Sequence, residues 1–318
     1  MDRLKNNLAS AWWAAVLSVI TATSVAAQEI QPRIIGGEVA PDGAWPATVA
    51  LVVAPAVHPP SALFCGGALV ASRWVLTAGH CVVDDNGVTP PHLIGVWTGS
   101  QSLDPQSGGE VVGVANIFVH PEFSQEPVSR VAVNDLALLE LTVPVDAEPL
   151  TLVGGSPPAG TPGYVVGWGW TDPDIPGSIS EDLQEVELPV ASNEACREVP
   201  AYSGILRDTM LCAGFLNGGK DACLGDSGAP LMVDTGEGFQ HAGLVSFGLD
   251  CAVTYGVYTR TSSFLDWITS IAPDVQVGPG DEGNGSGGGG GAISPWGLVV
   301  LFALVVTARL RRIKPGTR

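Results

Sequence analysis

The stretch Asp221-Ala222-Cys223-Leu224-Gly225-Asp226-Ser227-Gly228-Ala229-Pro230 sets a serine between an aspartate and a glycine, shortly after a cysteine. Alone it is weak evidence, because small residues cluster in ordinary turns, and a plain turn explains it as well as a reactive serine does. Two strings upstream change this balance: Leu76-Thr77-Ala78-Gly79-His80-Cys81 and Asn134-Asp135-Leu136-Ala137-Leu138-Leu139. Together they supply an imidazole, a carboxylate and a hydroxyl in one of the orders that acyl-transfer triads take.

These three motifs, in this order, resemble those of the trypsin-like serine peptidases, which have the chymotrypsin fold. The resemblance runs from Ile34 to about Ala272. It implies that Ser227 is the nucleophile, His80 the base that takes its proton, and Asp135 the group that orients the imidazole. Each also has a plainer explanation, since a histidine beside a cysteine could only pack and an aspartate before a strand could only cap a turn. The other histidines are expected in loops or at strand ends: His58, His92, His120 and His241.

The composition independently favours strands over long helices. The chain of 318 residues has 41 glycines and 25 prolines among many short apolar runs, a pattern typical of all-β proteins. Several runs alternate polar and apolar residues, as half-buried antiparallel strands do. With the resemblance, they predict two packed six-stranded antiparallel β-barrels with the catalytic cleft between them. The expected strands are 47–53, 68–70, 74–77, 92–97, 111–119, 136–141, 164–168, 184–190, 210–213, 230–233, 241–247 and 256–259.

A short helix is expected to close this domain, which we place at residues 34–273. Its apolar residues recur at helical spacing, between a serine cap and a proline stop. The residues concerned are Phe264, Trp267, Ile268 and Ile271, with Ser262 or Ser263 as the cap and Pro273 as the stop. We expect this helix to face the core and to have no part in catalysis.

The composition changes sharply after the helix. Residues 274–291 form a Gly-rich linker, 292–310 a hydrophobic membrane or sorting helix, and 311–318 a basic cytoplasmic tail. The apolar run is marginal for crossing a membrane, which takes about 17 to 25 residues. This arrangement resembles the bacterial GlyGly C-terminal sorting signal, which a rhomboid-type intramembrane peptidase cuts. A plain membrane anchor is the alternative.

The N-terminal region indicates export and activation. Residues 1–27 have the basic start, apolar run and small-residue end of a secretory signal peptide, which leaves residues 28–33 as an activation prosegment. The resemblance implies that a cut after Arg33 frees the α-amino group of Ile34, which then pairs with Asp226 and arranges the neighbouring turn. The alternative is that Arg33 is only an exposed basic residue. Because the substrate pocket assigned below would accept Arg33 itself, self-activation or activation by a sister enzyme is one hypothesis, and another activating peptidase is the alternative.

Six cysteines behind an export signal favour disulfides, and six cysteines allow 15 pairings that the sequence alone does not distinguish. The resemblance implies Cys65 with Cys81, Cys196 with Cys212, and Cys223 with Cys251. Free thiols or a metal cluster are the alternative, although no C-x-x-C spacing is present.

The resemblance also assigns an oxyanion hole and a substrate pocket. The amides of Gly225 and Ser227 would stabilise the negative charge on the substrate oxygen. Asp221 would lie at the pocket floor and select Arg or Lys, because a buried unpaired carboxylate gains from a cationic partner; a surface carboxylate is the alternative. Ser246, Gly248 and Gly256 would complete the pocket, with the two glycines as its small wall residues.

Four features depart from the family's usual pattern. Ala229 stands where a second glycine is usual, Phe247 where tryptophan is common, and Tyr255 where proline is frequent. The segment from Cys251 to Gly256 is also shorter than in typical trypsins. These changes affect the depth of the pocket and its subsites more than the reaction.

The charge and composition of the chain limit the classes of molecule that it is expected to bind. Residues 34–273 hold 6 basic and 27 acidic side chains, a formal charge of −21, which should repel nucleic acid and favour cationic substrates. No metal or organic cofactor is implied, and calcium binding stays open. We therefore predict an exported zymogen endopeptidase acting on protein or peptide substrates after Arg or Lys, at the cell surface or released from it. The alternatives are a catalytically silent peptidase fold used for binding and a tethered surface-display protein.

Overall fold

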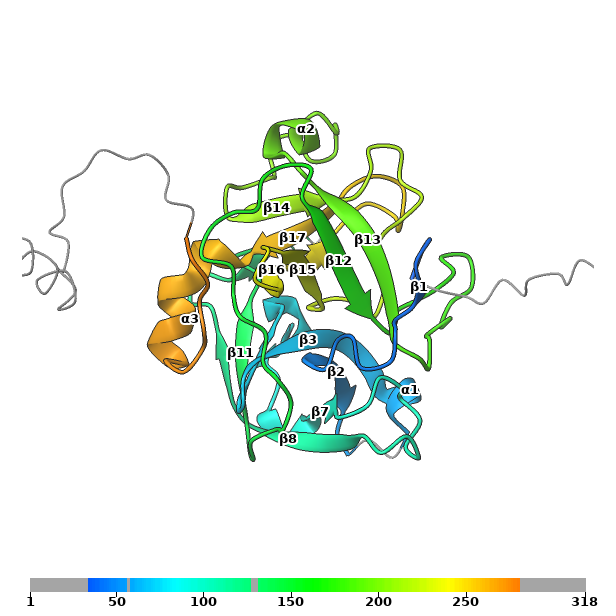
Figure 1. The fold of residues 1–318 in the computed structure, drawn as a ribbon, viewed down its shortest axis with the longest axis vertical. Coiled ribbons are helices and arrows are strands. Elements are labelled where there is room, and N and C mark those ends of the chain that lie inside the picture. Colours follow the sequence, from blue (N-terminus) through cyan, green and yellow to red (C-terminus); the bar gives the residue numbers. More distant parts are fainter. Residues whose placement is uncertain (1–33, 56–57, 127–130, 281–318) are drawn as a thin grey trace, which may run out of the picture.

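Short strands with turn residues between them form the two barrels of this protein, as a computed structural model shows (Figure 1). The structure describes residues 34–55, 58–126 and 131–280. Within them the all-β class and the two six-stranded barrels are confirmed, and each of the twelve expected strands is present. Most strand ends shift only slightly, but the strand expected at 68–70 extends over Leu63–Ala71.

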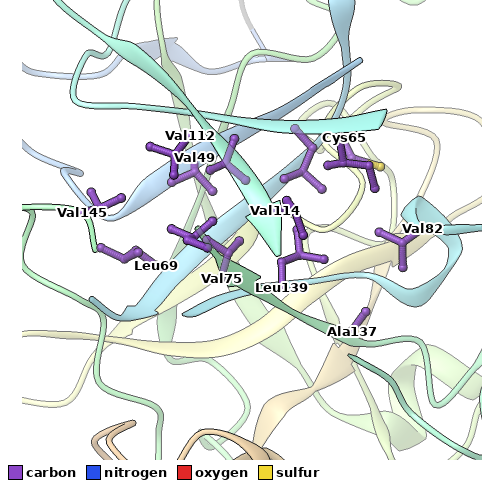
Figure 2. Packing of buried hydrophobic residues seen from close by; sticks show 14 of the residues in the cluster. Val49, Cys65, Leu69, Val75, Val82, Val112, Val114, Ala137, Leu139 and Val145 are labelled. Carbon is purple, nitrogen blue, oxygen red and sulfur yellow. The ribbon is translucent and has the colours of Figure 1, made fainter. Parts of the chain in front are cut away.

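The first barrel closes in the order β11-β4-β3-β2-β7-β8, with every neighbouring pair antiparallel. Its strands are β2 (Thr48–Val53), β3 (Leu63–Ala71), β4 (Trp74–Thr77), β7 (Ile94–Thr98), β8 (Glu110–Val119) and β11 (Ala137–Leu141). Alternate residues of these strands point inward, and Figure 2 shows valines and leucines such as Val49, Leu69 and Leu139 filling the interior. This packing holds the first barrel rigid beneath the loops at its end.

The second barrel follows the order β13-β12-β15-β16-β17-β14 and is closed by pairing between β13 and β14. Its strands are β12 (Pro162–Gly167), β13 (Gln184–Ala191), β14 (Met210–Ala213), β15 (Pro230–Asp234), β16 (Phe239–Phe247) and β17 (Gly256–Arg260). The two-residue β1 (Glu38–Val39) pairs with the outside of β13. Ile34, just before β1, packs in the barrel core with Val165, Leu188 and Leu231.

Several small elements were not expected from the sequence. They are the hairpins β5 (Val83–Asp84) with β6 (Gly87–Val88) and β9 (Ser124–Gln125) with β10 (Ala132–Val133), the helices α1 (Pro59–Ala62) and α2 (Asn193–Arg197), and the 3-10 turns η1 (Gly79–Cys81) and η2 (Pro91–Leu93). Each spans two to five residues, too few for a hydrophobic period to register. Of these, α2 has a signal in the sequence, which is the serine at its N-cap, Ser192. In the structure the Ser192 hydroxyl accepts from the amide of Ala195.

The closing helix is present, but its expected cap is wrong. A 3-10 turn, η3 (Thr261–Phe264), leads into α3 (Leu265–Ile271), so Ser262 and Ser263 lie inside the turn and no side chain caps the helix. Beyond α3 the chain turns back over the linker between the barrels, where Gly278 donates to the carbonyl of Leu152. Figure 1 shows α3 against the side of the two barrels.

The expected signal peptide, prosegment and tail lie outside the described residues, as do most of the linker and the whole hydrophobic segment 292–310. Among the residues that the structure describes, no helix has the length and apolar character needed to cross a membrane.

Candidate active site

The strands β4 and β11 bring His80 and Asp135 together. Both residues lie at the same end of this antiparallel pair, His80 in η1 after β4 and Asp135 just before β11. The Asp135 carboxylate accepts from the His80 backbone N–H at 2.9 Å and lies 2.8 Å from the His80 ring Nδ1. With Nδ1–H donating to the carboxylate, Nε2 keeps the lone pair that can accept a proton.

Two residues of the second barrel fix Asp135 from the other side. The Ser246 hydroxyl donates to the Asp135 carboxylate at 2.6 Å, and the Thr259 hydroxyl donates to its backbone carbonyl at 2.8 Å. Asp135 is therefore almost completely buried, with hydrogen bonds from both barrels. Sequence analysis placed Ser246 in the substrate pocket and did not identify Thr259, which no local motif marks.

The burial of His80 and the charge of Asp135 act on its pKa in opposite directions. Burial alone would lower the pKa of His80, but the charge of Asp135 and the hydrogen bond to it outweigh burial, so the pKa is raised above 6.5. The imidazole is thus a stronger base than a free histidine. As the pH falls, it becomes protonated, and so unable to accept a further proton, at a higher pH than a free histidine does.

Ser227 lies in the turn before β15, at the cleft that His80 also lines. Among the described residues, no hydrogen bond joins the side chains of His80 and Ser227. The carbonyl of Ser227 accepts from the amide of Gly66 at 2.8 Å. The left-handed Gly228 (φ 77°) has no room for a side chain, because a Cβ there would lie 2.3 Å from the Thr77 hydroxyl.

The backbone of this turn leaves two amides open for a ligand. The amides of Asp226, Gly228 and Ala229 donate to the carbonyls of Cys223, Val245 and Asp226. Those of Gly225 and Ser227, the two expected in the oxyanion hole, have no acceptor among the described residues. Gly225 adopts a φ of 98°, which glycine enters at no steric cost.

The methyl group of Ala229 is accommodated by a glycine on the first barrel. Ala229 is fully buried, and a Cβ on Gly66 would come within 2.8 Å of the Ala229 Cβ. The turn is therefore not crowded by the departure from the family pattern, because Gly66 supplies the space.

Asp221 lies in the wall of the same cleft, which Ser246, Gly248 and Gly256 also line. Burial raises the pKa of Asp221 to about 7, even though backbone amides, including that of Ala252 at 3.0 Å, donate to its carboxylate. The four residues predicted for the pocket are thus brought together. A Cβ on Gly256 would lie 2.9 Å from an Asp221 carboxylate oxygen, so this wall position needs glycine.

One tyrosine that lines this cleft and one that supports its wall were not predicted from the sequence. Tyr258 lines it, and its buried hydroxyl has no hydrogen-bond partner among the described residues. Tyr202 holds the outer wall, since its hydroxyl donates to the carbonyl of Tyr255 at 2.7 Å and accepts from the Leu249 amide at 3.1 Å. The sequence carries no signal for Tyr202, which bonds to residues about 50 positions away.

Asp226 occupies a closed cradle of backbone groups. Its carboxylate is fully buried and accepts from the amides of Gly169 at 2.8 Å and Cys223 at 3.0 Å. A Cβ on Gly167 or Gly169 would run into the carboxylate. Burial raises the pKa of Asp226 to about 6, and it has no cationic partner among the described residues. Ile34 is fully buried in the same barrel, whereas Arg33 lies outside the described residues.

Three disulfides are present, with the pairs that the resemblance implies: Cys65–Cys81, Cys196–Cys212 and Cys223–Cys251. The first holds the His80 turn to β3, and the last joins the two loops that line the cleft around Asp221. Cys65, His80 and Cys81 are near enough to share a metal ion, but a disulfide leaves no thiolate to bind it.

The expectation for His241 was wrong, because this residue lies inside β16 and is fully buried. Its Nδ1 lies 2.9 Å from the Thr261 hydroxyl, and burial lowers its pKa to about 3. His241 is thus a neutral core residue that takes no part in the cleft. The other three fall at the chain positions expected or in short turns: His58, His92 and His120.

Comparison with known proteins agrees with this geometry. The family model described as "Trypsin" matches residues 34–268. "Serine protease 56" of Mus musculus is 40% identical over 248 residues, which cover 74% of this chain and 38% of that protein. "Proclotting enzyme" of Tachypleus tridentatus is 39% identical over 253 residues, covering 74% of this chain and 65% of that protein. The chain therefore spans only 38% to 65% of the length of these relatives.

Proposed function

The chain belongs to the trypsin family of serine endopeptidases, and from this membership we propose that it hydrolyses peptide bonds after Arg or Lys by an acyl-enzyme mechanism. One observation carries the proposal: the hydrogen-bonded pair His80–Asp135, the hydroxyl of Ser227 and the buried carboxylate of Asp221 share one cleft. The combination supplies a base and a nucleophile for the scissile carbonyl of a bound residue, and a receptor for the cationic side chain of the same residue.

In the proposed reaction, Nε2 of His80 takes the Ser227 proton as Oγ attacks the scissile carbonyl, and Asp135 stabilises the imidazolium that forms. The open amides of Gly225 and Ser227 then donate to the carbonyl oxygen as it becomes negative. His80 returns the proton to the leaving amine, and water hydrolyses the acyl group by the same steps. Removing one such amide donor typically costs about 100-fold to 1,000-fold in turnover.

The preference for Arg or Lys is argued from the state of Asp221. Burial destabilises its charged form, as the raised pKa indicates, and a cationic substrate side chain would stabilise that form. An apolar side chain would leave the charge unpaired. The unpartnered hydroxyl of Tyr258 supports a polar ligand in the same pocket.

A fluorogenic peptide panel tests the function. We expect hydrolysis after Arg and Lys once the chain has been cut after Arg33, and no hydrolysis by the Ser227→Ala variant. Hydrolysis that survives Ser227→Ala would remove the proposed nucleophile. A cut chain that binds peptides without hydrolysing any would favour the alternative, a binding or surface-display protein that keeps the peptidase fold.

We propose that the chain is made as a zymogen, in keeping with the name of the Tachypleus relative, a proclotting enzyme. Cutting after Arg33 would give Ile34 a charged α-amino group that pairs with Asp226, the buried carboxylate without a cation. Asp221 would accept Arg33 itself, which makes self-processing testable. Persistent cutting of a purified Ser227→Ala chain, free of other peptidases, would exclude it.

Export and surface display remain proposals from the sequence. The signal peptide 1–27, the sorting helix 292–310 and the tail 311–318, with the membrane and a rhomboid-type peptidase as partners, concern residues beyond those described. The three disulfides support an oxidising compartment. Mass spectrometry of both ends of the mature protein would test the signal cleavage, the new Ile34 terminus and the fate of the tail together.

A further inference from the structure

A second hollow, of about 300 Å³, lies where the start of β2, the linker between the barrels and the turn between β15 and β16 meet. It shares no lining residue with the catalytic cleft. Its walls include Trp45, Met232 and Phe239, and its lining carboxylates are Glu148 and Glu237. The hollow is therefore aromatic on one side and acidic on another.

The aromatic wall belongs to a cluster of three rings. Phe239 packs edge-on against Trp45, with ring centroids 4.7 Å apart, and Tyr164 lies 5.7 Å from Trp45 and 5.5 Å from Phe239. Trp45 is buried, whereas Phe239 is 40% exposed, a high value for a ring in an organised cluster. A cation within about 6 Å of such a ring centroid is attracted by its negative face.

Two carboxylates outside the hollow accept hydrogen bonds from rings of this cluster. The Trp45 indole N–H donates to Glu185 at 2.5 Å, and the Tyr164 hydroxyl donates to Glu187 at 3.4 Å. Burial and the negative charges of Glu187, Glu185 and Glu38 all raise the pKa of Tyr164, so the surroundings of the cluster are negative. These negative charges favour a cation near the cluster.

No cation of the described chain neutralises the hollow. Glu148 and Glu237 are exposed and have no hydrogen bond or ion pair among the described residues, and no basic side chain lines the hollow. The described cations have other neighbours: Arg73 at Leu141 and Thr142, Arg197 at Asp208, Arg207 at Gly204, Lys220 at Gly36, and Arg260 at Asp208 and Met210. The hollow is therefore complementary in charge to a cationic ligand.

We propose that this hollow is a second cation site, which binds an arginine or lysine side chain on an extended segment of a protein partner. The guanidinium or ammonium group would contact Phe239 and pair with Glu237 and Glu148. Because the hollow is separate from the cleft, the residue bound here is not the residue cleaved. A protein with several basic residues could engage both sites, which raises its effective local concentration.

The test uses the full chain with Ser227→Ala and Asp221→Asn, which removes cleavage and the proposed primary cation pocket. Binding of a blocked peptide of alternating D-arginine and D-serine is measured by calorimetry, beside the same peptide with D-citrulline, an uncharged near-isostere of arginine. We expect the arginine peptide to bind and the citrulline peptide to bind at least roughly tenfold more weakly. Peptidase activity plays no part in this readout, so the result does not depend on the proposed function.

Matched variants locate the site. Glu237→Gln and Phe239→Ser should each weaken binding of the arginine peptide roughly threefold to tenfold, because one removes a carboxylate from the hollow and the other removes the ring. Glu110→Gln and Leu216→Ser, at exposed positions outside the hollow, should leave binding unchanged. Equal binding of the citrulline peptide, or an equal loss from Glu110→Gln, would overturn the proposal, because attraction would then be apolar or due to overall charge. Thermal unfolding of each variant checks its fold.

Discussion

At the residue scale, the site depends on how burial changes the affinity of two groups for protons. Burial lowers the affinity of His80 for its proton and the neighbouring Asp135 raises it by more, whereas Asp221 is held near the point where it changes charge at neutral pH. A single cleft thus contains the proposed base and the proposed cation receptor, and their charged states change over adjacent ranges of pH.

As the pH is lowered, activity should begin to decline above pH 6.5, because the pKa of His80 is raised and protonated His80 cannot accept the Ser227 proton. The measurement is kcat/KM of the processed enzyme for a blocked arginine substrate between pH 5 and 9, with the folded state checked by circular dichroism. A rate that stays flat down to pH 5 would contradict the role of His80 as the base.

Cation binding to the primary pocket should have its own pH dependence. The pKa of Asp221 is raised to about 7, so below that pH the carboxyl group is neutral and attracts a cation less. Benzamidine affinity for the Ser227→Ala chain should fall by up to about tenfold per pH unit below pH 7. Benzamide, the uncharged analogue, should show no such change, and Asp221→Asn should abolish the dependence. A persistent dependence in Asp221→Asn would move the cation site elsewhere.

Gly256→Ala should reduce activity on arginine substrates, because the added Cβ would lie 2.9 Å from the Asp221 carboxylate. Gly248→Ala is the comparison, since a Cβ there meets nothing nearer than the Tyr202 hydroxyl at 3.8 Å. We expect a loss of roughly tenfold or more in kcat/KM for Gly256→Ala, equivalent to at least ~1.4 kcal/mol, and a smaller loss for Gly248→Ala. The reverse order would mean that the pocket wall has been assigned wrongly.

How far residues could be predicted depends on whether their signal is local. His80, Asp135 and Ser227 each lie in a short motif, so the sequence was sufficient to single them out. Tyr202 and Thr259 act through contacts with residues 47 to 124 positions away, which no motif encodes. His241 was placed wrongly because a histidine at the start of an apolar run gives no sign of whether its ring points inward.

At the scale of elements, strands were predictable and their connections were not. The strands of the barrels alternate buried and exposed residues or form apolar runs, and these patterns are written into consecutive positions. The cap of α3 was not foreseen because a 3-10 turn takes up the serines that precede the helix. The fit of Ala229 against Gly66 joins two barrels, so only the assembled fold reveals why a methyl group is tolerated there.

Two disulfides with different surroundings should have different effects when removed. Cys196–Cys212 ties α2 to β14, whereas both cysteines of Cys223–Cys251 line the cleft. Replacing Cys196 and Cys212 by serine should lower the free energy of unfolding by about 2 to 4 kcal/mol and leave KM nearly unchanged at 25 °C. Replacing Cys223 and Cys251 should also raise KM for arginine substrates. An equal change of KM in both would refute the distinction.

At the scale of the whole molecule, the contribution of Asp226 to the stability of the uncut chain should fall as the pH rises through the pKa of this group. The pKa of this group is raised from 3.8 to about 6 in the folded state, so the folded state binds the extra proton between those values. Its stabilising contribution is complete below pH 3.8 and is lost as the pH rises through 6, by roughly 2 to 3 kcal/mol. His241, whose pKa is lowered to about 3, acts in the opposite direction.

Urea unfolding of the uncut Ser227→Ala chain at several pH values, with and without Asp226→Asn, isolates this contribution. The difference in unfolding free energy between the two proteins should change between pH 4 and 6 and then level off. If that difference stays constant with pH, Asp226 is not a buried carboxylate awaiting a cation.

The anchoring of Asp135 from both sides has a further meaning. The Asp135 carboxylate belongs to the first barrel and the two hydroxyls that bond to Asp135 belong to the second barrel. Ser227, the proposed nucleophile, also lies in the second barrel. Catalysis therefore reports on how the two barrels are seated against each other. In mild denaturant, a small displacement of one barrel relative to the other would abolish activity while the circular dichroism spectrum stayed native.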